Sequence, residues 1–182
     1  MAGIFTSSTT APASGCWGAP APKKKLVVGM GDLMVGNDPT AQLVTYSLGS
    51  CVGIAIYDPV AKVGGLLHAM LPDSTINPER AATRLFMFVD TGLPALFHAV
   101  YALGGAKQRM TVKLVGGAEF LDGKKIFNIG RRNVEAALAM LARNGVSVAG
   151  SETGGHESRT VKLDMANGDF TLDIPGRQTF LL

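Results

Sequence analysis

Short apolar runs dominate the sequence from Leu26 onward, and they are separated by Gly, Asp, Asn and Pro. Many residues in these runs are β-branched, and such runs bounded by turn residues are typical of β-strands. The pattern predicts strands at residues 26–30, 42–46, 51–57, 63–70, 111–116, 146–150, 159–164 and 169–174. The chain is therefore constrained to a fold built on β-sheets.

Three stretches carry helical signals. The step Asn77-Pro78-Glu79 supplies a capping residue, a proline at the first helical position and an acid in the first turn. The other two stretches end at Gly104 and Gly145, where a left-handed cap is permitted. We expect helices at about 78–90, 92–103 and 131–143, the last with Val134, Leu138 and Leu141 on one face. Because strands outnumber helices and do not alternate with them regularly, the predicted fold class is α+β.

Length and composition indicate one folded domain behind a leader. The chain has 182 residues, of which 47% are hydrophobic and 17% charged, so it can bury one sizeable core. Residues 1–24 are instead rich in Ala, Ser, Thr, Pro and Gly, a composition that buries too little surface to offset the entropy of ordering. We expect a disordered leader over residues 1–24 and a single domain over residues 25–182.

The excess basic charge is confined to the start of the chain. Lys23, Lys24 and Lys25 account for the whole formal net charge of +3, since the remaining bases and acids are equal in number. A nucleic-acid-binding protein is expected to carry a clustered basic face. Nucleic acid is therefore not an expected partner.

Neither an export signal nor a membrane segment is recognisable. Residues 1–22 lack a basic and an apolar region in the order that a signal peptide has. The longest apolar stretch, 92–103, is shorter than the roughly 20 residues that a spanning helix needs.

The two cysteines, Cys16 and Cys51, have neither zinc-ligand nor disulfide spacing. We expect a cytoplasmic protein with no membrane insertion, no bound metal and no cofactor.

One stretch, from Thr45 to Pro72, joins a cysteine to a histidine. Cys51 lies in a Gly-Ser-Cys turn, and His68 follows seventeen residues later. The step Tyr57-Asp58-Pro59 ends the strand that begins at Cys51, because proline cannot donate to a sheet ladder. Residues 51–70 are thus predicted to form a hairpin, which brings Cys51 and His68 to the same end of the sheet.

A cysteine and a histidine placed together can perform thiolate chemistry on a carbonyl group. An imidazole, with an ordinary pKa of about 6.5, can take the thiol proton and return it to a departing amine. Backbone amides near Gly49 and Ser50 are candidates to hold the oxyanion, at about 3 kcal/mol per donor. Taken singly, Cys51 is better explained as a small core hydrophobe and His68 as a hydrogen-bonded core residue; the pairing favours chemistry.

Other signals are weaker. His98 lies inside an apolar helical stretch and is assigned to structure, whereas His156 follows two glycines and is a candidate for the rim of a binding site. Tight turns explain Gly116-Gly117-Ala118 and the start of the third helix, although a helix N-terminus also holds anions. Phosphate-loop, HExxH and GxSxG motifs do not occur in the sequence.

Several segments in combination resemble the chemoreceptor glutamine deamidase family, CheD. They are TYSLGSCVGIAIYDP, GGLLHAMLP, KLVGGAEF, NIGRRNV and the late GG...SR, and they run in order from about Gly29 to about Leu172. The family's catalytic set is a threonine, a cysteine six residues later and a histidine seventeen residues after that. Thr45, Cys51 and His68 match both the identities and the spacing.

The resemblance implies an activity and a set of partners. Enzymes of this family convert selected glutamine side chains of methyl-accepting chemotaxis receptors to glutamate and release ammonia. The implied nucleophile is Cys51 and the implied base is His68, with Thr45 orienting the imidazole or the substrate. The family fold is α+β, with packed mixed or antiparallel sheets and outer helices, and is similar to that of cysteine-dependent deamidating toxins. A CheC-type phosphatase is a second implied partner.

Two departures and two alternatives accompany the resemblance. The leader is longer than the family pattern requires, and Ala69 stands where an aromatic residue is commoner. Receptor methylesterase activity is an alternative, because ester hydrolysis would pass through the same acyl-enzyme. The other alternative is a non-catalytic adaptor that binds receptor helices or a phosphatase and keeps Cys51 for packing.

Overall fold

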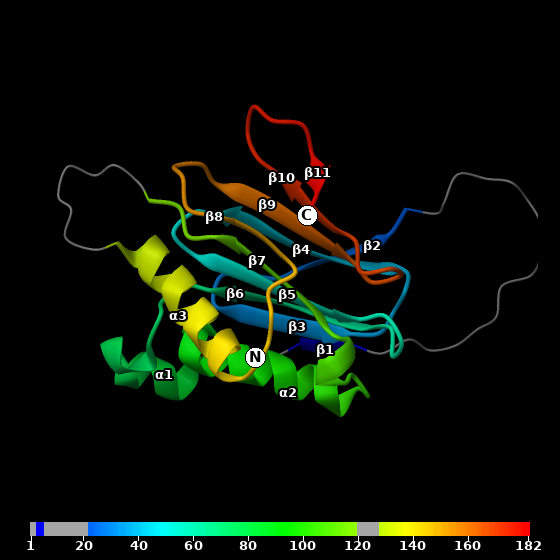
Figure 1. Ribbon diagram of the computed structural model, residues 1–182, viewed down its shortest axis with the longest axis horizontal. Helices are drawn as coiled ribbons and strands as arrows, with labels where there is room; N and C mark the ends of the chain where they lie inside the picture. Colours follow the sequence, from blue (N-terminus) through cyan, green and yellow to red (C-terminus); the bar gives the residue numbers. More distant parts are fainter. Residues whose placement is uncertain (1–2, 6–21, 120–127) are drawn as a thin grey trace, which may run out of the picture.

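Two stacked β-sheets with helices on the outer face of one of them make up the protein (Figure 1). The computed structural model describes residues 3–5, 22–119 and 128–182. The strands carry most of the regular structure and the helices lie to one side, so the predicted α+β class with packed mixed sheets and outer helices is confirmed.

The larger sheet has six strands and contains the predicted hairpin. Its four central strands are antiparallel to one another, while each edge strand runs parallel to the strand it pairs with. In spatial order the strands are β1 (Gly3–Phe5), β3 (Asp32–Gly36), β6 (Val63–Ala69), β5 (Val52–Asp58), β7 (Thr111–Gly116) and β8 (Gly150–Thr153).

The smaller sheet has five strands and covers the other face of the larger one. Its strands are, in spatial order, β11 (Phe180–Leu181), β10 (Phe170–Asp173), β9 (Arg159–Asp164), β4 (Ala41–Leu48) and β2 (Lys24–Val27). Only the edge strand β2 is parallel to its neighbour among the described residues. The chain passes from the smaller to the larger sheet between β4 and β5, which is where Cys51 lies.

Helices and short 3₁₀ turns complete the structure. The α-helices are α1 (Pro78–Thr83), α2 (Val89–Ala102) and α3 (Ile129–Arg143). The 3₁₀ turns are η1 (Ser74–Ile76), η2 (Leu85–Met87) and η3 (Lys107–Arg109). Helix α1 begins as predicted, since Asn77 accepts a hydrogen bond from the N–H of Arg80 and Pro78 occupies the first helical position.

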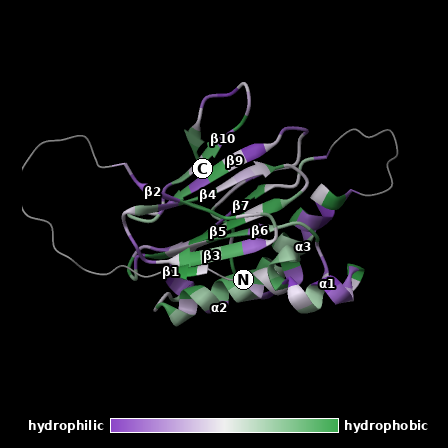
Figure 2. Cartoon of the chain, turned by 180° about the vertical axis from the view of Figure 1, so that it is seen from behind, coloured by the Kyte–Doolittle hydropathy of each residue, from purple (hydrophilic) through white to green (hydrophobic). Residues whose placement is uncertain are grey.

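Two apolar layers fill the space on either side of the larger sheet. One lies between that sheet and helices α2 and α3, and includes Leu67, Leu93 and Leu96. The other lies between the sheets, and includes Leu43 and Phe170. All residues of β5 and β6 are buried, and the central strands stand out as hydrophobic in Figure 2. Since each buried Leu or Phe stabilises the fold by about 1.5–3 kcal/mol, this hairpin is anchored on both faces.

The turn of the hairpin is fixed by a buried carboxylate. Asp58 accepts hydrogen bonds from the N–H groups of Val60, Ala61 and Ala106 and pairs with Arg109 at 2.7 Å. Burial alone would raise the pKa of Asp58, but these donors outweigh it and hold that pKa well below the ordinary carboxyl range. The predicted hairpin over 51–70 is confirmed, with β5 and β6 paired along their whole length.

The predicted helix over 78–90 is wrong. Helix α1 ends at Thr83, and the backbone of Arg84 leaves the helical region with φ −134° and ψ 63°. The next residues form η2, and its last residue contacts the chain just after β6, since the N–H groups of Met70 and Leu71 both donate to the carbonyl of Met87. Pairing with the chain just after a buried strand here overrides the helical signal.

Two other elements differ from the predicted ones. The strand expected at 146–150 is β8 at Gly150–Thr153, because the N–H of Val146 still caps α3 by donating to Leu141. The buried stripe of α3 is Gly130, Asn133, Ala137 and Leu141, whereas Leu138 is exposed. Close contact of Gly130 with the chain at residues 117–118 sets this rotation of the helix.

Three strands go unpredicted: β1, β3 and β11. Strand β1 falls within the predicted disordered leader, where pairing with the free edge of β3 supplies backbone hydrogen bonds that composition does not reveal. Residues 6–21 of that leader lie outside the described residues, so disorder there stays a prediction.

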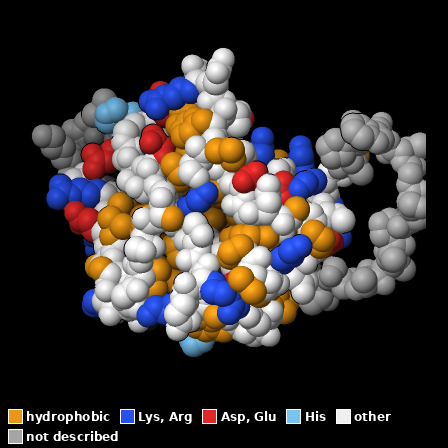
Figure 3. All heavy atoms as spheres, turned by 45° about the vertical axis from the view of Figure 1, so that its right-hand side comes forward, with side chains coloured by type: hydrophobic (Ala, Val, Ile, Leu, Met, Phe, Trp, Pro, Cys, Tyr) orange, Lys and Arg blue, Asp and Glu red, His pale blue; other side chains and the backbone are white. Residues whose placement is uncertain are grey.

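Charged side chains of both signs are mixed over the face drawn in Figure 3, with no single basic field. This distribution agrees with the even balance of bases and acids beyond the first 25 residues. None of the helices in the described residues is long and apolar enough to cross a membrane.

Candidate active site

A β-bulge carries the chain from the smaller sheet toward Cys51. The register of β4 against β9 shifts between Thr45 and Leu48, and Ser47 adopts a left-handed conformation with φ 56°. Bulges of this kind bend a strand and redirect its side chains. Here the bulge leaves Thr45 on the buried side of β4 and sends the chain across to the start of β5.

Thr45 and His68 meet between the two sheets. The Oγ1 of Thr45, on β4, lies 2.7 Å from Nδ1 of His68, on β6. Both side chains are fully buried, with exposures of 0% and 1%. The same Thr45 hydroxyl donates to the backbone carbonyl of Val28 at 2.7 Å.

These two contacts assign the tautomer of His68. A hydroxyl has one proton, and the carbonyl of Val28 can only accept, so that proton points to Val28. Thr45 must then accept from His68, which places the ring proton on Nδ1. The other ring nitrogen, Nε2, is buried and has no hydrogen-bond partner among the described residues. His68 therefore keeps an unused lone pair on Nε2, as a proton acceptor requires.

Register places Cys51 beside His68 on the inner face of the larger sheet. Gly53 lies directly opposite His68, and Cys51 precedes Gly53 by two residues, so both side chains belong to the same face. The backbones of two residues in this diagonal arrangement lie about 7–8 Å apart across the strand pair, a distance that a long side chain can span. Cys51 is half-buried and packs at the edge of the layer between the sheets.

Burial keeps both groups uncharged at neutral pH. It lowers the pKa of His68 to about 4. It raises the pKa of the Cys51 thiol, although the backbone N–H of Cys51 itself acts in the opposite direction. The resting pair is thus a thiol and a neutral imidazole rather than a preformed ion pair.

The backbone carbonyls of Gly49, Ser50 and Cys51 each accept a hydrogen bond from the segment after β7 or from α3. The carbonyl of Gly49 accepts from the N–H of Ala118 at 2.8 Å, and that of Cys51 accepts from the N–H of Gly117 at 2.8 Å. The carbonyl of Ser50 accepts from the side-chain amide of Asn133 at 2.9 Å. The loop that carries the thiol is thereby fixed against the end of β7 and the start of α3.

Glycine is required at residue 116 for this close approach. Gly116 has a φ of 101°, and a Cβ there would lie 2.3 Å from the Cys51 carbonyl oxygen. This distance is far shorter than any contact between non-bonded atoms. The Gly-Gly turn noted in the sequence thus makes room for the cysteine loop.

The structure brings Thr45 and His68 into contact and sets Cys51, Gly49 and Ser50 at the same end of the sheet. Sequence reasoning missed Asn133 and the carbonyl of Val28. A signal for Asn133 does exist, because an Asn on the buried stripe of an amphipathic helix needs hydrogen-bond partners. No sequence signal identifies Val28, since it acts through its backbone.

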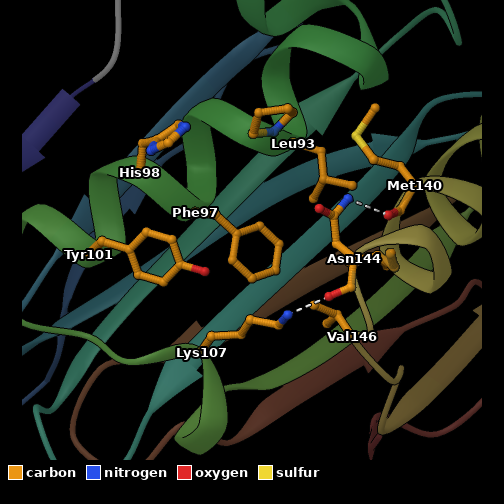
Figure 4. Close-up of a pocket in the computed structure, with 10 residues that line it drawn as sticks. Leu93, Phe97, His98, Tyr101, Lys107, Met140, Asn144 and Val146 are labelled. Atoms are coloured by element: carbon orange, nitrogen blue, oxygen red, sulfur yellow. Dashed lines mark hydrogen bonds between the residues drawn. The ribbon is translucent and has the colours of Figure 1, made fainter.

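The remaining histidines lie elsewhere. His98 is exposed and lines a groove of about 200 Å³ between α2 and α3, with Phe97, Tyr101 and Lys107 nearby (Figure 4). This groove is on the helical side of the larger sheet, whereas His68 faces the other sheet. The exposed His156 lies 2.6 Å from the carbonyl of Glu119 through its Nδ1. Within the described residues no group of His, Cys, Asp and Glu could hold a metal ion.

The buried imidazole of His68 should make the stability of the protein depend on pH between about 4 and 6.5. The pKa of His68 is about 4 in the folded protein and about 6.5 when unfolded, so only the unfolded chain gains a proton between these values. The free energy of unfolding should fall on acidification from pH 7, by on the order of 2 kcal/mol at pH 5. Chemical denaturation at both pH values measures this.

A His68→Gln variant should lose most of that pH dependence, whereas the control His98→Gln, at an exposed histidine, should keep it. An equal slope in the His68→Gln protein and the parent would contradict the assigned burial.

Two glycines with positive φ provide a matched test of the cysteine loop. Gly116 is crowded by the Cys51 carbonyl, whereas Gly104, with φ 89°, has open space around its Cα. Gly104→Ala should cost only the left-handed strain of about 1–2 kcal/mol. Gly116→Ala should cost more and should also change the rate at which iodoacetamide labels Cys51. Equal melting temperatures and labelling rates for the two variants would argue against the close approach.

A family model and the relatives of this chain point to the same family. A family model described as CheD chemotactic sensory transduction matches residues 70–173, a range that begins two residues after His68. A protein from Solibacter usitatus named probable chemoreceptor glutamine deamidase CheD is 43% identical over 159 residues, which cover 87% of this chain and 94% of the relative. A second such relative, from Syntrophus aciditrophicus, is 48% identical over 143 residues, covering 79% of this chain and 89% of its own.

Among solved structures, Bacillus licheniformis YfiH matches with 12% identity and a TM-score of 0.41, over 66% of this chain and 49% of YfiH. The relatives, unlike YfiH, match over most of both chains, and their alignments are long enough to show common descent. This chain belongs to the CheD chemotactic sensory transduction family.

Proposed function

We propose that this protein is a chemoreceptor glutamine deamidase that converts receptor glutamine side chains to glutamate and releases ammonia. The observation that carries the proposal is a neutral, buried His68 on the same face as Cys51, whose Nε2 has no hydrogen-bond partner in the part of the chain that the structure describes. Two relatives that match most of this chain are named for that activity. Thr45, Cys51 and His68 are the proposed site residues.

The proposed reaction begins with proton transfer from the thiol. Nε2 of His68 takes the proton of Cys51, and the sulfur attacks the carboxamide carbon of the glutamine side chain. The tetrahedral intermediate collapses as the imidazolium gives its proton to the departing nitrogen, which leaves as ammonia. Water then attacks the thioester with His68 as base, giving glutamate and restoring the thiol.

Thr45 supports the step in which His68 becomes charged. Its Oγ1 accepts from Nδ1 of His68 and so keeps Nε2 directed to the reacting atoms. Its own proton is held by the carbonyl of Val28, so the hydroxyl cannot compete by donating to the ring. A neutral acceptor lowers the cost of the buried imidazolium less than a carboxylate would, which agrees with the low pKa of His68.

The proposed oxyanion donors are the backbone N–H groups near Gly49, Ser50 and Cys51. A trans peptide points its C=O and its N–H in opposite directions. Because the carbonyls of Gly49 and Ser50 point to Ala118 and Asn133, the N–H groups that follow them point away from those residues. They are therefore available to a carbonyl oxygen of the substrate.

The proposed substrate is the cytoplasmic helical part of a methyl-accepting chemotaxis receptor, and the proposed location is the cytoplasm. Each conversion adds one negative charge to the receptor and so acts on it electrostatically. A CheC-type phosphatase is a second proposed partner, supported by the family resemblance.

Purified protein incubated with a receptor cytoplasmic domain tests the activity. We expect ammonia release together with peptides whose mass shows conversion of an amide to a carboxylate. Cys51→Ala should abolish both signals, because it removes the nucleophile. Cys16→Ala is the matched control and should retain them.

Ammonia release by Cys51→Ala at the parent rate would disprove the thiol mechanism. Methanol release without ammonia would favour the methylesterase alternative. If the parent binds several cognate receptors but releases neither product, the adaptor alternative is correct.

A further inference from the structure

Asn133 is a buried amide at the junction of the two segments that carry the candidate catalytic groups. It lies in the second turn of α3 and has no exposed surface. Its Nδ2 donates to the carbonyl of Ser50 and to the carbonyl of Met70, both at 2.9 Å. Ser50 directly precedes Cys51, and Met70 follows His68 by two residues. One side chain thus holds the ends of both hairpin strands.

The two acceptors fix the orientation of this amide. Carbonyl oxygens can only accept, so the NH₂ group and not the oxygen of Asn133 must face them. The remaining oxygen, Oδ1, is buried and has no hydrogen-bond partner among the described residues. An unpaired buried polar atom is destabilising. The two backbone acceptors explain the amide at this position, because an apolar side chain would leave the carbonyls of Ser50 and Met70 without this donor.

The contact with Ser50 acts on the peptide group next to the thiol. The carbonyl of Ser50 and the N–H of Cys51 belong to one planar peptide and point in opposite directions. With the carbonyl directed to Asn133, the N–H is directed away from the Asn133 side chain. Consistent with this, the N–H of Cys51 interacts favourably with its own thiolate. Donation to the carbonyl also polarises the peptide and strengthens its N–H as a donor.

We propose that Asn133 is a positioning residue that holds the Ser50–Cys51 peptide so that the N–H of Cys51 serves as an oxyanion donor. The second bond, to Met70, ties this peptide to the strand that carries His68 and keeps the donor in register with the base. The inference deepens the proposed deamidase function, and it applies to any acyl transfer to Cys51.

Two probes separate this role from a merely structural one. Acylation of Cys51 by p-nitrophenyl acetate passes through an oxyanion, whereas alkylation by iodoacetamide does not. The ratio of the two rates therefore reports on the oxyanion donors and cancels changes in thiol exposure or ionisation. All proteins carry Cys16→Ser, so that Cys51 is the labelled thiol.

The variants are Asn133→Leu, which removes both hydrogen bonds, and Asn133→Asp, which keeps the shape but loses the NH₂ group. Leu141→Ala is the control, because it destabilises the same helix from its buried stripe without touching the cysteine loop. The ratio of acylation to alkylation should fall about 100-fold in both Asn133 variants, as on loss of one oxyanion donor. It should stay unchanged in Leu141→Ala.

A ratio within about threefold of the parent in a folded Asn133 variant overturns the inference. Unfolding of both Asn133 variants, seen by circular dichroism, also overturns it and assigns the residue to structure alone. If the parent is acylated normally but releases no ammonia from receptors, the deamidase proposal fails while the role of Asn133 is still decided by the ratio.

Discussion

The hydrogen bond between Thr45 and His68 is the contact on which the site depends. It joins the two sheets, because Thr45 belongs to β4 of the smaller sheet and His68 to β6 of the larger one. It also selects the ring tautomer, because the Thr45 proton is already committed to Val28. Stacking of the sheets therefore determines which ring nitrogen of His68 carries the proton and which keeps its lone pair.

Burial gives this arrangement its chemical character. In a layer that excludes water, an imidazolium and a thiolate are both disfavoured, so the pair rests uncharged. In the proposed mechanism, the proton moves from the thiol to the imidazole only when a substrate carbonyl can take up the negative charge. Backbone N–H groups fixed by contacts from β7 and α3 stabilise that charge in the proposed mechanism. The glycines at 116 and 117 allow those contacts to form.

The hairpin, the fold class and the shared location of Cys51 and His68 could be predicted from the sequence, because strand patterns and a Tyr-Asp-Pro turn are local signals. The contact of Thr45 with His68 could not be derived from patterns, because it crosses between sheets. The break after Thr83 could not be predicted either, since it depends on backbone contacts of residues 87–89 with Met70 and Leu71, far away in the sequence. Asn133 is an intermediate case. Its place on the buried stripe of a helix predicts that it needs hydrogen-bond partners, but the sequence does not indicate which residues they are.

The tautomer of His68 is the central claim, and nitrogen NMR of the histidine-labelled protein tests it most directly. We predict a neutral ring at pH 7 with its proton on Nδ1, and no protonation until the pH approaches about 4. In a Thr45→Val variant the preference for Nδ1 should be lost, while Thr45→Ser should keep it. A ring protonated on Nε2, or an imidazolium at pH 7, would contradict the account.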